Sequence, residues 1–128
     1  MTGNKVLLDT NVVIDLFKGD SPILSFLQTQ QALYVPAAVL GELYLGAYRS
    51  TNVNKHLLEV RNFLVICTIL NADRETAENY GIIKSTLLKK GKPIPENDIW
   101  IAATALQHQL PLYTRDKHFE EVTGITLV

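Results

Sequence analysis

Four acidic residues are candidates for chemistry because of where they stand in the sequence. Asp9 directly follows the short apolar run KVLL, and Glu42 is the only charged residue between positions 35 and 48. Asp98 lies in the segment PENDIW, and Asp116 lies in YTRDKH. An isolated buried carboxylate is costly unless it is paired, hydrogen-bonded or bound to a metal. We therefore ask what these four acids could do if the fold brings them together.

A cluster of four carboxylates would require a cation. Two unit charges about 4 Å apart repel each other by about 4 kcal/mol at an effective dielectric constant near 20. Oxygen ligands with open positions favour Mg²⁺, or alternatively Mn²⁺, over zinc. His56, His108 and His118 show no zinc-like spacing to one another or to Cys67, and we interpret His118 as a surface residue. Such a metal site suits hydrolysis of a phosphodiester bond, because a bound divalent ion activates water and screens phosphoryl charge.

Polar residues beside the acids are candidates for supporting roles. Asn11 follows Asp9 by two residues and could orient it or hold a metal-bound water. Thr114 and Arg115 directly precede Asp116. Arg115 could contact a phosphate group or form an ordinary salt bridge, and the sequence favours neither.

Each acid also has an ordinary structural interpretation. Asp9 and Asp116 could cap the helical segments that follow them, and Asp98 could complement the dipole of its helix. Glu42 is harder to explain in this way, because a helix that is apolar nearly all round is normally buried. Asp15 is interpreted as a surface charge.

The elements that would position these acids alternate between strands and helices. Apolar runs predict strands at 6–8, 33–35, 67–70, 112–114 and near 125–127, and helical spacing predicts helices at 12–19, 21–28, 37–50, 53–64, 73–90 and 96–108, with a helical turn from residue 116. This alternation predicts an α/β fold with a parallel sheet covered on both faces.

That architecture predicts where the acids lie. In a parallel α/β sheet, the carboxyl ends of the strands and the amino ends of the helices share one edge, where ligands bind. Asp9 and Asp116 follow strands, and Asp98 is in the first turn of a helix. Glu42 is about two turns into its helix, about 8 Å from the same edge at ~1.5 Å per residue. We therefore expect the four carboxylates to converge.

Composition limits the domain number and the cellular environment. The chain has 128 residues, which suits a single domain over 1–128, and its formal charge is −1. Because the net charge is near zero, nucleic acid would have to be bound by a local basic patch. The candidate residues for it are Lys84, Lys89, Lys90, Lys92, Arg115 and Lys117. A basic helix end that complements its dipole explains Lys89 and Lys90 equally well. The single Cys67 and the lack of a long apolar run predict a cytoplasmic protein without a membrane partner.

The four acidic segments together resemble one known family. LLDTNVVIDL with Asp9, VPAAVLGELYLGA with Glu42, PENDIWIAATAL with Asp98 and LYTRDKHFEEVTGI with Asp116 are similar, in this order and spacing, to PIN domains of the VapC type. The resemblance spans essentially the whole chain. It implies a three-layer α/β/α sandwich with a central, mainly parallel sheet, and an Mg²⁺-dependent endoribonuclease that is the toxin of a type II toxin–antitoxin pair. It also implies that the four acids hold the metal, with Asn11 and Thr114 in support.

The same resemblance implies three partners: an RNA substrate, a cognate antitoxin and a second copy of the chain. We expect the RNA to be cut where it is single-stranded or looped out. The apolar segments ILSFL (23–27) and YLGAY (44–48) could form an antitoxin groove or a dimer face, although core packing explains them as well. Two alternatives stay open for the function, namely a PIN-fold nuclease of RNA processing and a non-catalytic RNA- or protein-binding module. A phosphatase with Asp9 as nucleophile is disfavoured, because Asn11 stands where its general acid would be.

Overall fold

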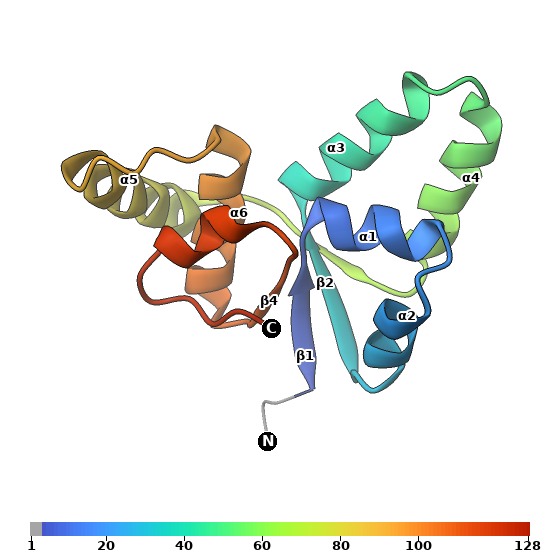
Figure 1. Ribbon diagram of the computed structural model, residues 1–128, viewed down its shortest axis with the longest axis horizontal. Helices are drawn as coiled ribbons and strands as arrows, with labels where there is room; N and C mark the ends of the chain where they lie inside the picture. Colours follow the sequence, from blue (N-terminus) through green and yellow to red (C-terminus); the bar gives the residue numbers. More distant parts are fainter. Residues whose placement is uncertain (1–3) are drawn as a thin grey trace.

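The computed structural model of the protein describes residues 4–128 and confirms the predicted α/β fold class (Figure 1). Its elements in chain order are β1 (Lys5–Leu8), α1 (Thr10–Phe17), α2 (Ser21–Gln28), β2 (Ala32–Pro36), α3 (Ala37–Tyr48), α4 (Val53–Leu64), β3 (Thr68–Leu70), α5 (Arg74–Lys89), α6 (Glu96–His108), β4 (Leu112–Tyr113) and the 3₁₀ helix η1 (Lys117–Glu121).

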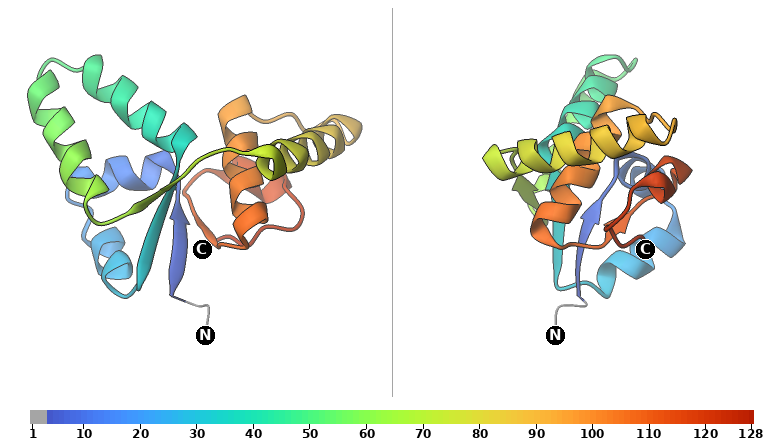
Figure 2. Two further views of the ribbon diagram at one scale, coloured as in Figure 1. Left: turned by 180° about the vertical axis from the view of Figure 1, so that it is seen from behind. Right: turned by 90° about the vertical axis from the view of Figure 1, so that its left-hand side faces the viewer.

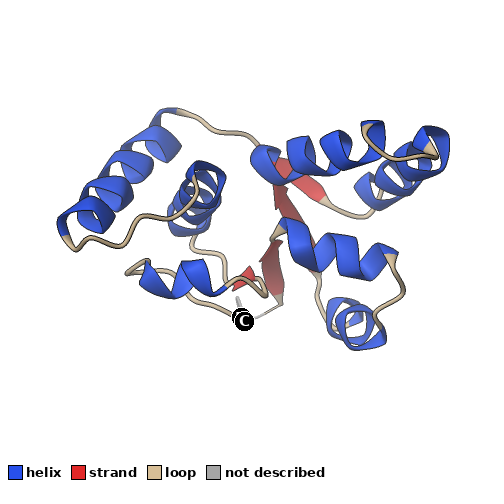
Figure 3. Cartoon of the chain, turned by 45° about the horizontal axis from the view of Figure 1, so that its top comes forward, coloured by secondary structure: helices blue, strands red, loops and turns tan. Residues whose placement is uncertain are grey.

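The strands form one sheet in the order β3-β2-β1-β4, and every neighbouring pair is parallel. The chain builds β1, β2 and β3 in one direction and then returns to place β4 on the other side of β1. Helices α1 to α4 therefore cover one face of the sheet, and α5, α6 and η1 cover the other (Figures 1 and 2). Figure 3 shows the strands between these two helical layers. The reversal places a topological switch point beside the carboxyl end of β1, where ligands bind in open α/β sheets.

The core fixes the two segments that carry the predicted site. Val6, Leu7 and Leu8 of β1 are fully buried, as expected for a central parallel strand with helices on both faces. On the carboxyl-terminal side, Leu112 of β4 and Phe119 of η1 are also fully buried. The loop between β4 and η1 is therefore anchored at both ends.

Most predicted element boundaries differ from the structure by one or two residues. The helices predicted at 53–64 and 96–108 match α4 and α6. Helix α1 begins at Thr10, earlier than predicted, because Asp9 caps it. Helix α5 ends before Gly91, whose positive φ of 67° is the left-handed conformation expected after a helix terminus.

The prediction of a fifth strand at 125–127 is wrong. That segment forms only an isolated parallel bridge between Leu112 and Leu127, supported by two backbone hydrogen bonds to Leu112. The strand predicted at 112–114 ends at Tyr113, and the next residue, Thr114, donates a side-chain hydrogen bond to Asp9. Across residues 4–128, the structure contains no helix with the length and hydropathy needed to span a membrane.

Candidate active site at the carboxyl end of the sheet

Asp9 is buried at the end of β1, with only 4% of its surface exposed. Its Oδ1 accepts a hydrogen bond from the Thr10 N–H at 2.8 Å, and its Oδ2 accepts one from the Thr114 hydroxyl at 2.6 Å. Burial raises the pKa of Asp9, the two hydrogen bonds lower it, and the negative charge of Asp116 raises it again. Asp9 thus caps α1, as the structural interpretation predicted, and also faces the other acids.

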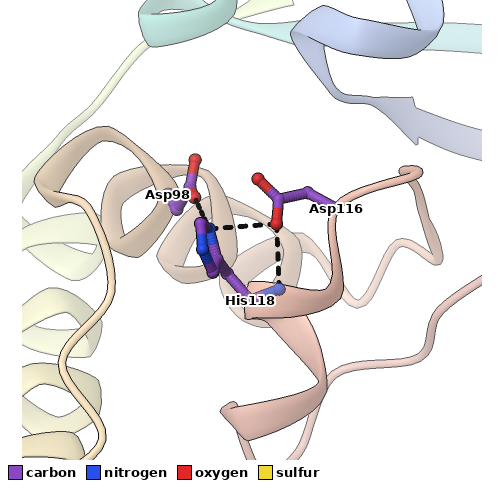
Figure 4. A group of neighbouring side chains, drawn as sticks. All are labelled: Asp98, Asp116 and His118. Carbon is purple, nitrogen blue, oxygen red and sulfur yellow. Dashed lines mark hydrogen bonds and ion pairs between the residues drawn. The ribbon is translucent and has the colours of Figure 1, made fainter.

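Asp98 and Asp116 meet across the site through His118. The His118 Nδ1 atom lies 3.2 Å from Asp98 Oδ2 and 2.9 Å from Asp116 Oδ1, and the three side chains point toward one another (Figure 4). One potential ligand atom from each lies within 4.8 Å of those of the other two. Burial raises the pKa of Asp98, the His118 hydrogen bond lowers it, and the charges of Asp9 and Asp116 raise it. The three aspartates are therefore close enough to repel one another.

Glu42, on helix α3, stands apart from this group. Its Oε1 accepts a long hydrogen bond of 3.4 Å from the side chain of Asn97, the residue before Asp98 on α6. Its carboxylate is not among the potential ligand atoms that gather around His118. The expectation that α3 is buried all round is wrong, since Leu45 and Tyr48 are 56% and 63% exposed.

The predicted supporting residues hold the loop that carries Asp116. Besides donating to Asp9, the Thr114 hydroxyl accepts a hydrogen bond from the Asp116 N–H at 2.9 Å. The Asn11 side chain accepts a hydrogen bond from the Arg115 N–H at 3.3 Å, rather than orienting Asp9 as predicted. Thr114 and Asn11 together connect β4 to the start of α1.

Arg115 forms salt bridges, which resolves the two alternatives that the sequence left open. Its guanidinium nitrogens lie 2.7 Å from Asp15 Oδ2 and 2.9 Å from Asp20 Oδ2. Asp15, interpreted from sequence as a surface charge, is therefore paired with Arg115. Because Asp20 also caps α2, Arg115 ties the loop after β4 to the α1–α2 segment.

The positive charge of the predicted basic patch is reduced by similar pairing. Lys84 binds Glu96, and Lys90 lies 3.7 Å from a carboxylate oxygen of Glu121. With Arg115, three of the six candidate cations are therefore already paired with acids. These three side chains therefore add little net positive charge for binding nucleic acid.

His118 is the site residue that the sequence interpretation missed. The sequence feature that could have indicated it is its position two residues after Asp116. Asp116 caps η1 by accepting a hydrogen bond from the His118 N–H at 2.9 Å. This cap brings the two side chains to the same edge of the sheet. The hydrogen bond to Asp98 is the largest cause of a raised pKa at His118.

The donor set fits a hard divalent cation. Asp9, Asp98 and Asp116 offer carboxylate oxygens, the ligands that Mg²⁺ and Mn²⁺ prefer. The raised pKa values of Asp9 and Asp98 show that burial and mutual repulsion disfavour their ionised forms. A bound cation would favour the ionised forms of both carboxylates instead.

Comparisons with known proteins agree with this architecture. The family model described as PIN domain matches residues 6–125. Ribonuclease VapC2 of Haemophilus influenzae is 38% identical over 124 residues, covering 94% of each chain. The tRNA(fMet)-specific endonuclease VapC of Salmonella typhimurium is 29% identical over 126 residues, covering 96% of each chain.

A solved structure gives the same result in three dimensions. The crystal structure of DNA-bound VapBC from Salmonella typhimurium contains a chain that matches with a TM-score of 0.90 and 28% identity, covering 97% of this chain and 96% of that one. The matched family model spans nearly all of the described residues, and the sequence motifs, the fold and the relatives agree. The chain therefore belongs to the PIN-domain family and is similar to its VapC members.

Proposed function

We propose that this protein is an Mg²⁺-dependent endoribonuclease, with Mn²⁺ as an alternative ion, and that it is the toxin of a type II toxin–antitoxin pair. The observation that carries the proposal is the approach of Asp9, Asp98 and Asp116, from three separate elements, at the switch point of the sheet. The names of the relatives, which are ribonucleases, support the same reaction class.

Asp9, Asp98 and Asp116 would hold the metal, and Glu42 would complete the acidic set from the α3 side. When bound, the ion supplies Lewis-acid activation of the attacking water and screens the charge of the phosphate. The Thr114 hydroxyl favours the ionised form of Asp9, because a hydrogen bond to a carboxylate stabilises its charge. Asn11 and Arg115 keep Asp116 in place by binding the preceding loop to α1 and α2.

RNA with an unpaired loop is the proposed substrate. The Salmonella typhimurium relative is named for a tRNA, a folded RNA with accessible loops, which supports this class. A structured tRNA and an unstructured RNA of equal length, tested side by side, would separate recognition of a fold from cleavage of any single strand.

The decisive test is cleavage of RNA by the purified protein with Mg²⁺, with EDTA, and after Asp98→Asn. We expect cleavage that requires the metal and is lost in the variant. Glu96→Gln is the matched control, because Glu96 lies in the same helical turn but binds Lys84 and Tyr80 rather than the site. Cleavage that continues unchanged in EDTA, or in Asp98→Asn, would reject the mechanism.

An antitoxin segment is the proposed occupant of an apolar groove between α1, α3 and α4. The groove has a volume of about 360 Å³, and its lining residues are Ile14, Phe17, Lys18, Glu42, Leu43, Gly46, Ala47, Ser50, Lys55, His56, Glu59 and Val60. Because Glu42 belongs to this lining, a segment in the groove would reach the acidic site and could block it. The apolar segment 23–27 contributes no residue to the groove: Ile23 and Leu27 are buried in the core, and Leu24 is 48% exposed at another place.

Gly46→Leu tests the groove without disturbing the acids. A Cβ atom at Gly46 meets no atom within 4 Å, so the larger side chain can project into the groove. We expect the variant to cleave RNA normally but to resist inhibition by a co-expressed cognate antitoxin. Full inhibition of Gly46→Leu would show that the antitoxin binds elsewhere.

A homodimer is also proposed, on the basis of apolar side chains on the surface of α3 and α4. Leu45, Tyr48 and Leu58 are each more than half exposed. Sedimentation of the isolated protein would test this, and a monomer at micromolar concentration would contradict it.

A further inference from the structure

The imidazole of His118 lies between two of the proposed metal-binding carboxylates. Its Nδ1 atom is 3.2 Å from Asp98 Oδ2 and 2.9 Å from Asp116 Oδ1. A single ring nitrogen carries at most one proton, so it can donate one well-directed hydrogen bond and not two. Of the two short contacts at this nitrogen, at most one is therefore a well-directed hydrogen bond, and the other is a close contact of the ion-pair type.

The spacing of these atoms matches neighbouring ligands of one metal ion. In an octahedral site with bonds of about 2.1 Å, adjacent ligand atoms are about 3 Å apart. The two distances from Nδ1 are close to this value. Figure 4 shows that Asp98 from α6, His118 from η1 and Asp116, which precedes η1, point toward a common region.

We propose that His118 is a nitrogen ligand of the divalent metal held by Asp98 and Asp116. The proposal rests on the proposed function, because it concerns the same site. It gives the site one nitrogen and several oxygen donors in place of an all-carboxylate set. Imidazole suits transition metals better than Mg²⁺, so His118 raises the affinity of the site for Mn²⁺ and Co²⁺ relative to Mg²⁺.

His118 is suited to this role by its support and its exposure. Its backbone N–H is held by the Asp116 cap, and the neighbouring Phe119 is fully buried, so the residue has a fixed position. Its side chain is half exposed, so the ring can adjust when a metal binds. The cap uses only the backbone of His118, and it is kept in any substitution of this side chain.

Pulsed electron paramagnetic resonance of the full protein with Mn²⁺ tests the proposal directly, because it detects a nitrogen nucleus bonded to the ion. We expect nitrogen coupling in the wild type and in His108→Asn, the matched control at the far end of α6. We expect no coupling in His118→Asn or His118→Ala. The dissociation constant for Mn²⁺ should rise at least about tenfold in these variants, and that for Mg²⁺ should rise less.

The possible results separate this inference from the proposed function. If the wild type binds Mn²⁺ and cleaves RNA but shows no nitrogen coupling, or if coupling survives in both His118 variants, the role of His118 is refuted and the nuclease stands. If the wild type binds neither Mn²⁺ nor Mg²⁺, both proposals fail. Thermal unfolding of each variant checks that a lost signal is not a lost fold.

Discussion

Replacing Thr114 with valine removes one hydroxyl and nearly preserves the shape of the side chain. That hydroxyl donates to Asp9 Oδ2 at 2.6 Å. A hydrogen bond to a charged group contributes roughly 1.5–3 kcal/mol, and about 1.4 kcal/mol corresponds to one pKa unit. The pKa of Asp9, which burial already raises, should therefore rise further in Thr114→Val, because the ionised carboxylate loses a hydrogen bond of this strength.

The consequence is a shift in the pH dependence of RNA cleavage. A metal ion binds the ionised carboxylate and must displace the proton from Asp9 at low pH. A higher pKa keeps the proton bound up to a higher pH. The acidic limb of the profile should therefore move to higher pH. Activity below that limb should fall by roughly tenfold to a hundredfold, while activity well above it approaches the wild-type value.

Thr104→Val is the matched control for this experiment. Thr104 is a buried threonine, whereas Thr114 is partly buried, and the Thr104 hydroxyl donates to the Trp100 carbonyl within α6 rather than to a carboxylate. Its profile should superimpose on that of the wild type. An unshifted acidic limb in Thr114→Val would refute the reasoning, as would a loss of activity at every pH in a variant that still binds Mn²⁺ normally.

Two further predictions concern stability and loop position. Because the folded-state pKa values of Asp9 and Asp98 are raised, their contribution to stability is complete below about pH 4 and is lost as pH rises through the raised values. In EDTA at neutral pH, Asp9→Asn should therefore unfold at a higher temperature than the wild type, and it should gain less from added Mg²⁺; a lower unfolding temperature would contradict this. Arg115→Ala should slow RNA cleavage several-fold with little change in unfolding temperature, because its exposed salt bridges position the Asp116 loop, and Arg115→Lys should be intermediate. Equal rates of RNA cleavage by the wild type and Arg115→Ala would refute a role of Arg115 in positioning the Asp116 loop.

The position of three of the acids was predictable because it depends only on topology. Parallel strands joined by helices must place the residues after β1 and β4, and the first turn of α6, at one edge of the sheet. Asp9, Asp116 and Asp98 occupy these positions. No knowledge of side-chain packing was needed.

The contacts of Glu42 and Arg115 depend on packing, and the sequence could not show them. The apolar residues of α3 look the same in sequence whether they face the core or the surface, so the exposure of Leu45 and Tyr48 was hidden. Arg115 meets Asp15 and Asp20 because β4 pairs directly with β1, which places residues about a hundred positions apart in contact.

The structural and catalytic interpretations of the acids are not alternatives in this fold. Asp9 caps α1 and Asp116 caps η1, and each accepts a backbone N–H, while Asp98 lies in the first turn of α6. Backbone donors at helix starts stabilise negative charge and lower the cost of gathering carboxylates at one edge. They do not remove that cost, since the pKa values of Asp9 and Asp98 remain raised. Helix starts therefore make the acidic cluster tolerable in the folded chain, and the remaining cost, which comes from burial and from mutual repulsion, is the free energy that a bound cation can recover.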